Sequence, residues 1–103
     1  MTKSDRPHIE IAKRLCAFRK TLGLTQKEFA EKHKFPRTRY NHWERGVRRI
    51  PVESAAILED RYGLTLDFIY LGRLRTLPHG LANTLSDGQM LNLHNKGDDT
   101  LIT

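Results

Sequence analysis

The run of residues 24–51, LTQKEFAEKHKFPRTRYNHWERGVRRIP, constrains the fold most, because it holds two short helical patterns separated by a break. Thr25 stands just before an apolar pattern and Glu28 follows three residues later, so each can cap a backbone amide of the other at a helix start. Phe29 and Ala30 form the inward pair, and Ala30 is small enough to let another helix cross closely. We therefore predict a first helix of about two turns in this run.

A second helix is predicted from about residue 36 to residue 45. Pro36 cannot donate a backbone hydrogen bond and disfavours the α conformation at the residue before it, so the first helix must end and a new one can begin. Tyr40 and Trp43 lie three residues apart on one face, which favours packing in a core over stacking on unpaired bases. The outward set can hydrogen-bond base edges and phosphates, and it consists of Arg37, Thr38, Arg39, Asn41 and His42.

Three more helices are predicted around this pair. Each begins after a proline or threonine and ends at a glycine, as helix starts and stops commonly do. Their predicted bounds are residues 9–22 between Pro7 and Gly23, residues 51–62 between Pro51 and Gly63, and residues 66–71 between Thr65 and Gly72. Five helices without a convincing strand predict an all-α domain over residues 1–72.

The segment 73–103 is predicted to be a short C-terminal tail, either partly disordered or in contact with the domain or with a second copy of it. Pro78 and Gly80 are expected to interrupt any helix there. Its apolar residues favour docking, and they are Leu74, Leu77, Leu81, Leu85, Met90, Leu91 and Leu93.

Three sequence motifs together make the chain resemble a known family. They are the opening Leu24-Thr25-Gln26 with Phe29-Ala30 behind it, the closing Trp43-Glu44-Arg45-Gly46, and Pro51 after a basic loop. Over residues 9–72 the chain is similar to the helix-turn-helix domain of lambda-repressor/Cro-type transcriptional regulators. The resemblance implies a five-helix lambda-repressor-like DNA-binding domain. Two departures, Lys34 in place of a turn glycine and Pro36 in place of a serine or threonine, concern the geometry of the turn.

The resemblance also implies roles for individual residues. Gln26 matches a position that contacts the DNA backbone and braces the recognition helix, and Arg19 matches an arginine that pairs with Glu44. The base-reading positions correspond to Arg37, Thr38, Arg39, Asn41 and His42. Contacts with the DNA backbone are expected from Gln26, Lys27, Arg45, Arg48 and Arg49, and structural roles from Ala30, Tyr40 and Trp43.

Positive charge is concentrated in the predicted domain. The formal net charge is +6, yet residues 1–75 hold 17 Lys and Arg against 9 Asp and Glu, whereas residues 76–103 hold 1 against 3. The basic stretch at residues 27–49 is the footprint expected for phosphate contacts with release of counterions, and a merely solvated basic face is the alternative.

Other classes of function find little support in the sequence. The five histidines are scattered, the single Cys16 has no metal-ligand spacing, and no glycine-rich phosphate loop is present, so we predict neither an enzyme nor a metal or cofactor. Cys16 lies on the inward side of its helix, which indicates a buried thiol in a reducing compartment rather than a redox switch. The sequence has neither an apolar run of membrane-spanning length nor a signal-peptide pattern, so we expect a cytoplasmic protein.

We therefore predict a sequence-specific regulator, most simply a repressor, that binds double-stranded DNA with the helix at about residues 36–45 in the major groove. Since one small domain contacts few base pairs, we expect a homodimer on a palindromic operator. The alternative is an antitoxin or protein-interaction module of the same fold that binds a partner protein through its tail. For His42, a contact with DNA and an ordinary place on the surface are both open.

Overall fold

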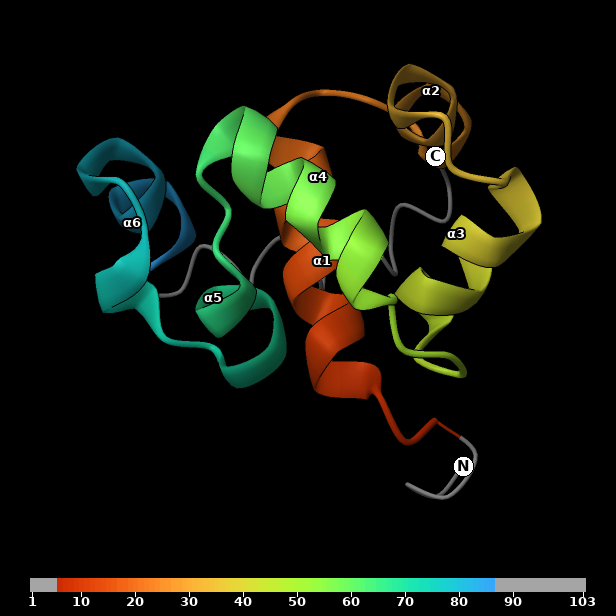
Figure 1. Cartoon of the computed structure of the whole chain (residues 1–103), viewed down its shortest axis with the longest axis horizontal. Coiled ribbons are helices and arrows are strands. Elements are labelled where there is room, and N and C mark those ends of the chain that lie inside the picture. Colours follow the sequence, from red (N-terminus) through yellow and green to blue (C-terminus); the bar gives the residue numbers. More distant parts are fainter. Residues whose placement is uncertain (1–5, 87–103) are drawn as a thin grey trace.

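The computed structural model describes residues 6–86, and within that range the protein is built from helices without a strand. The elements are α1 (Ile9–Thr21), α2 (Gln26–His33), α3 (Arg37–Arg45), α4 (Val52–Tyr62), α5 (Leu66–Leu71), the 3₁₀ turn η2 (Leu74–Thr76) and α6 (His79–Leu85). Helix α1 lies in the middle, with α2 and α3 on one side and α5 and α6 on the other (Figure 1). The five helices predicted from the sequence are all present, and α6 is additional.

The start of α2 is fixed by the predicted capping box. The Thr25 hydroxyl accepts the Glu28 amide at 3.1 Å, and the Glu28 carboxylate accepts the Thr25 amide at 2.9 Å. The helix ends at Lys34, which has φ 60° and ψ 36° and so adopts the left-handed conformation that glycine usually supplies. A non-glycine residue in this conformation costs about 1 to 2 kcal/mol, so the departure from glycine at Lys34 strains the turn.

Helix α3 begins without a side-chain cap. Pro36 occupies the N-cap position with φ −61° and ψ 127°, and no side chain accepts a hydrogen bond from the first turn. Proline presets the backbone for the turn but has no hydroxyl, so the first amides of α3 are left open to solvent or to a ligand. At the other end the left-handed Gly46, with φ 81°, closes the helix.

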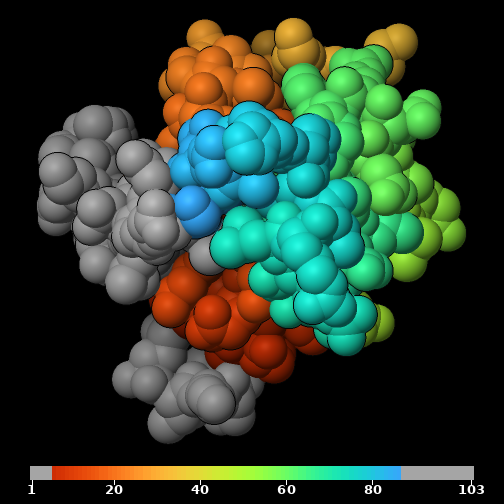
Figure 2. Space-filling view, turned by 90° about the vertical axis from the view of Figure 1, so that its left-hand side faces the viewer, coloured from red at the N-terminus to blue at the C-terminus, as the bar shows by residue number. Residues whose placement is uncertain are grey.

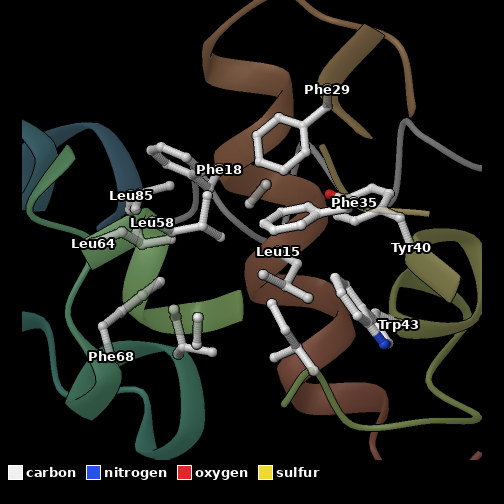
Figure 3. Close-up of a cluster of buried hydrophobic side chains, with 14 of the residues drawn as sticks. Leu15, Phe18, Phe29, Phe35, Tyr40, Trp43, Leu58, Leu64, Phe68 and Leu85 are labelled. Atoms are coloured by element: carbon white, nitrogen blue, oxygen red, sulfur yellow. The ribbon is translucent and has the colours of Figure 1, made fainter. Parts of the chain in front are cut away.

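The rings that α2 and α3 bring together form one end of the hydrophobic core. Tyr40 is 0% and Trp43 is 4% exposed, and ring centroids are 5.0 Å apart for Phe29 and Tyr40 and 5.3 Å apart for Phe35 and Trp43. Figure 3 shows these rings gathered around α1, with leucines of α4 and α6 on the far side of the same cluster. Rings this deeply buried pack with one another and have no face available to stack on a base.

Helix α6 corrects the prediction that Pro78 and Gly80 interrupt any helix. Pro78 is the N-cap of α6, where the missing backbone N–H would have had no partner in the helix anyway, and Gly80 lies in the first turn. Leu77 and Leu85 are 7% and 1% exposed and belong to the main core cluster. Figure 2 shows the segment leading into α6 and α6 itself, cyan to blue, covering the face between the end of α1 and α4.

Residues 74–86 of the predicted tail therefore dock on the domain rather than leaving it. Full burial of a leucine side chain stabilises a fold by roughly 1.5 to 3 kcal/mol, so Leu85 alone is a substantial contact. The predictions made for Met90, Leu91 and Leu93 lie outside the described residues. None of the helices in the described range is both long and apolar enough to span a membrane.

Candidate nucleic-acid interface

Helix α3 turns one polar face outward and one aromatic face inward. Arg37, Thr38 and Arg39 are exposed, and Asn41 and His42 are half-buried at the edge of the same surface. The side chains of Tyr40 and Trp43 point into the core, as the spacing of three predicts for one face of a helix. The structure thus leaves all five residues that the sequence assigned to base contacts at least partly exposed on α3, and their individual roles stay predictions.

Four exposed cations flank α3 in the sequence and the fold. Lys27 at the start of α2, Arg45 at the end of α3, and Arg48 and Arg49 in the following loop are all exposed. Within residues 6–86, the ion pairs involve other cations: Lys13 with Glu10, Arg19 with Glu44, and Arg73 with Asp67. The arginines of α3 and its loop therefore carry positive charge without a neutralising carboxylate among the described residues, which suits contact with phosphate.

Beneath α3, the Glu44 carboxylate joins three elements. It accepts Arg19 Nε at 2.7 Å and Arg19 Nη2 at 3.1 Å from α1, Gln26 Nε2 at 3.0 Å from α2, and the hydroxyl of Tyr40 one turn earlier in α3. The side chains of Arg19 and Glu44 are 12% and 3% exposed, so this is a largely buried ion pair. Its position fixes α3 against the two helices that contact it.

Burial and Glu44 together perturb the ionisable groups around this carboxylate. Burial alone would lower the pKa of Arg19, but the hydrogen bonds and charge of Glu44 outweigh it and hold that pKa above its ordinary value. Burial, followed by the negative charge of Glu44, raises the pKa of Tyr40 well above its ordinary value. The same two causes raise the pKa of Cys16 to about 11, so its thiol stays protonated and inert, as the sequence suggested.

Gln26 connects this buried network to the outward face of α3. Its Nε2 donates to Glu44, and its Oε1 accepts Asn41 Nδ2 at 3.0 Å. The bracing role that the resemblance implied for Gln26 thus has a geometric basis. Sequence reasoning missed the link to Asn41, because nothing in the spacing of residues 26 and 41 indicates that two separate helices place their amides side by side.

Two hydrogen bonds connect the end of α3 to the residues that precede α1. The His8 amide donates to the Gly46 carbonyl at 2.9 Å, and Arg6 Nε donates to the Arg45 carbonyl at 2.7 Å. A Cβ added to Gly46 would lie 3.0 Å from the Ile9 Cα, so both the positive φ and this backbone contact require glycine. The guanidinium of Arg6 also places a cation at the negative end of the α3 dipole, a contact that no sequence motif indicated.

His33 ties the helix-turn-helix unit to α4. Its Nδ1 hydrogen-bonds the Phe29 carbonyl at 2.7 Å, so Nδ1 carries the proton and Nε2 accepts the Tyr62 hydroxyl at 2.7 Å. The residue is 3% exposed, and desolvation by burial is the main cause that lowers its pKa. His33 is therefore a structural histidine, and among the described residues no group of three or more His, Cys, Asp or Glu side chains could hold a metal ion.

Comparison with known proteins gives one match. A family model described as helix-turn-helix matches residues 15–69, which is more than half of the chain and spans α1 from Leu15 through α5 to Ile69. No curated protein and no solved structure matches the chain. The matched range contains the buried Glu44 network, the whole of α3 and the basic loop that follows it.

Proposed function

Because the chain belongs to the helix-turn-helix family of the lambda-repressor/Cro type, a family of DNA-binding regulators, we propose that it is a sequence-specific transcriptional repressor. In this proposal α3 lies in the major groove of double-stranded DNA, which is wide enough to admit an α-helix. The observation that carries it is the outward face of α3 and its loop, where five arginines have no carboxylate partner among the described residues.

Base contacts are proposed for the residues at the exposed start and middle of α3. Arg37 is the leading candidate, since a guanidinium can donate two hydrogen bonds to the O6 and N7 of guanine. Thr38 and Arg39 are the next exposed residues along α3, and Asn41 follows Arg37 by one turn on the same face. His42 completes the set as a donor to a base or a phosphate.

Contacts with the DNA backbone are proposed for Gln26 and for the cations that border this face. Lys27 and Gln26 lie at the N-terminus of α2, where backbone amides also favour an anion. Arg45, Arg48 and Arg49 lie at the other end of α3, so the two groups could hold phosphates on both sides of the groove. Such contacts fix the position of the helix without selecting a sequence.

A homodimer on a palindromic operator is the proposed working form. One α3 helix of 9 residues contacts few base pairs, and two-fold related copies double the site when half-sites lie about one helical turn apart. The proposed place of action is the cytoplasm, with neither a catalytic reaction nor a cofactor.

The antitoxin or protein-interaction alternative relied on the leucines of the tail. Leu77 and Leu85 pack into the core, so they are not available to bind a partner without unfolding α6. That alternative now depends on residues after 86, and deletion of residues 87–103 tests it. Loss of a co-purifying protein on this deletion, with DNA binding intact, would support it.

Selection from a random double-stranded DNA pool tests the main proposal. We expect an enriched palindrome and an affinity that falls steeply with salt, because phosphate contacts release counterions. Arg48→Ala should weaken binding and flatten the salt dependence, whereas Arg75→Ala removes the same charge from the exposed 3₁₀ turn beside α6 and should change neither. A wild-type protein that enriches no sequence, or equal effects of the two variants, would refute it.

A further inference from the structure

We infer that Asn41 presents its carbonyl oxygen to the DNA and selects a base that carries an exocyclic amino group, adenine or cytosine. The inference rests on the proposed function, since it assumes that α3 lies in the major groove. It follows from a row of hydrogen bonds that runs from Arg19 through Glu44 and Gln26 to Asn41. The charge at one end of this row sets the direction of every hydrogen bond along it.

The first step is the carboxylate of Glu44. It faces the Arg19 guanidinium through two hydrogen bonds, at 2.7 and 3.1 Å, so it is ionised and can only accept. Gln26 lies 3.0 Å from the Glu44 carboxylate. Of the two ends of the Gln26 amide, only the NH2 group can donate to that oxygen, and the opposite orientation would set two acceptors against each other.

The second step is the amide of Asn41. Because the Gln26 nitrogen is turned toward Glu44, its oxygen is the end that faces Asn41 across a distance of 3.0 Å. Asn41 must therefore donate with Nδ2, and its Oδ1 points away from Gln26. Within the described part of the chain no group donates to this Oδ1, and Asn41 is half-buried on the outward face of α3. An acceptor of fixed direction is thus presented to whatever binds there.

The third step is the chemistry of the major groove. Adenine N6 and cytosine N4 are donors there, whereas guanine O6 and N7 and thymine O4 are acceptors. A fixed carbonyl oxygen pairs with the first two and opposes the others. Adenine fits best, because the second N–H of Nδ2 remains free to donate to adenine N7.

Gln26 and Glu44 are positioning residues in this scheme, since they act on the base through Asn41. Gln26→Met keeps the length of the side chain and removes both hydrogen bonds, so the Asn41 amide becomes free to rotate and offer either end. A residue that only supported the fold would lower the affinity for all sequences equally. A residue that orients Asn41 instead changes the preference at one base position.

The experiment compares the selected DNA sites of the wild type, Asn41→Ala, Gln26→Met and Arg75→Ala in the full chain. We expect one position of the wild-type site to be adenine or cytosine, to lose its preference in Asn41→Ala, and to accept guanine and thymine in Gln26→Met. The other positions should stay unchanged in both variants, and all positions should stay unchanged in Arg75→Ala. Circular dichroism before selection verifies that each variant is folded, which is expected because alanine and methionine favour helix.

A modified operator separates the hydrogen bond from other effects. If the selected base is adenine, it can be replaced in the operator by purine, which lacks the exocyclic amino group. This replacement should weaken wild-type binding on the order of tenfold but leave Asn41→Ala binding unchanged. An unchanged site profile in Asn41→Ala, or a lost preference for guanine or thymine, would overturn the inference while the proposed function stands. Failure of the wild type to enrich any sequence would refute the proposed function, and this inference with it.

Discussion

Replacing Glu44 by alanine should strongly destabilise this protein, because the lost carboxylate is 3% exposed and is the partner of a largely buried guanidinium. Among the residues that the structure describes, the variant leaves the Arg19 guanidinium, which is 12% exposed, with the Leu24 carbonyl at 2.8 Å and a distant contact to the Cys16 sulfur. It also removes the acceptor of the Tyr40 hydroxyl, whose residue is 0% exposed. Gln26 Nε2 loses its acceptor as well, but Gln26 keeps the hydrogen bond from Asn41 and lies nearer to solvent.

The expected loss follows from these contacts. Breaking a buried ion pair by removing one partner costs about 3 to 5 kcal/mol, because the remaining charge is uncompensated. A buried hydroxyl without a partner accounts for about 1 to 3 kcal/mol of such a penalty. For a domain whose total stability is about 5 to 15 kcal/mol, a loss of this size leaves the folded state marginal.

Urea and thermal unfolding followed by circular dichroism measure the effect. At roughly 4 to 8 °C for each kcal/mol, we expect the unfolding midpoint to fall by at least about 12 °C. Glu10→Ala is the matched control, since it removes the carboxylate of the exposed pair with Lys13 at 3.6 Å and should cost less than about 1 kcal/mol. Equal losses in the two variants would show that the Glu44 pair is as weak as a surface pair.

The double variant Arg19→Met, Glu44→Leu tests the cause of that loss. If the uncompensated charge of Arg19 dominates, removing both charges should recover much of the stability, because apolar replacements of buried pairs are often neutral or stabilising. A double variant as unstable as Glu44→Ala would instead locate the loss in the Tyr40 hydroxyl and the packing around it.

Three further predictions concern the core, a buried histidine and the DNA contacts. Trp43→Ala should cost about 3 to 5 kcal/mol in urea unfolding, and a stable variant that only loses DNA binding would contradict its place in the core. Since burial lowers the pKa of His33 in the folded state, stability should be full above the unfolded pKa of about 6.5 and fall as the pH drops through the folded pKa. His33→Gln should reduce this pH dependence, and an identical profile would refute the assignment. Arg37→Ala should cost about 1 to 3 kcal/mol of binding free energy at the selected site and relax the preference at one base position, whereas Arg48→Ala should weaken binding to all sequences alike. An unchanged base preference in Arg37→Ala would reassign Arg37 to contacts with the DNA backbone.

The main helices could be predicted because their signals are local. The Thr25 and Glu28 capping box, the proline before α3 and the glycines that end helices act within a few residues of where they stand. Helix α6 was missed because a proline followed by glycine was interpreted as a break. The decisive factor is tertiary, since α6 packs against α1 and η2 and buries Leu85 in the core cluster, which stabilises a 7-residue helix that would not form alone.

The sequence predicted which face of a helix each residue of the candidate site lies on, but it predicted fewer of the contacts between their atoms. Spacing correctly predicted Tyr40 to point inward and Arg37 to point outward, because side chains follow a fixed repeat around an α-helix. The pair of Arg19 and Glu44 came from the resemblance alone, since 25 residues and two turns separate them in sequence. The contact of Gln26 with Asn41 could not be predicted, because it depends on the angle at which α2 meets α3.

The position of the buried ion pair indicates what it contributes to this fold. A pair of apolar residues could fill the same space at equal or greater stability, so stability alone does not account for a charge that is 3% exposed. A carboxylate, unlike an apolar side chain, has a hydrogen-bonding direction that it imposes on its neighbours. In this protein Gln26 transmits that direction from Glu44 to Asn41, which lies on the surface that faces DNA. The double variant that removes both charges should therefore keep much of its stability and lose base preference at one position, so that stability and recognition are separated at a single buried pair.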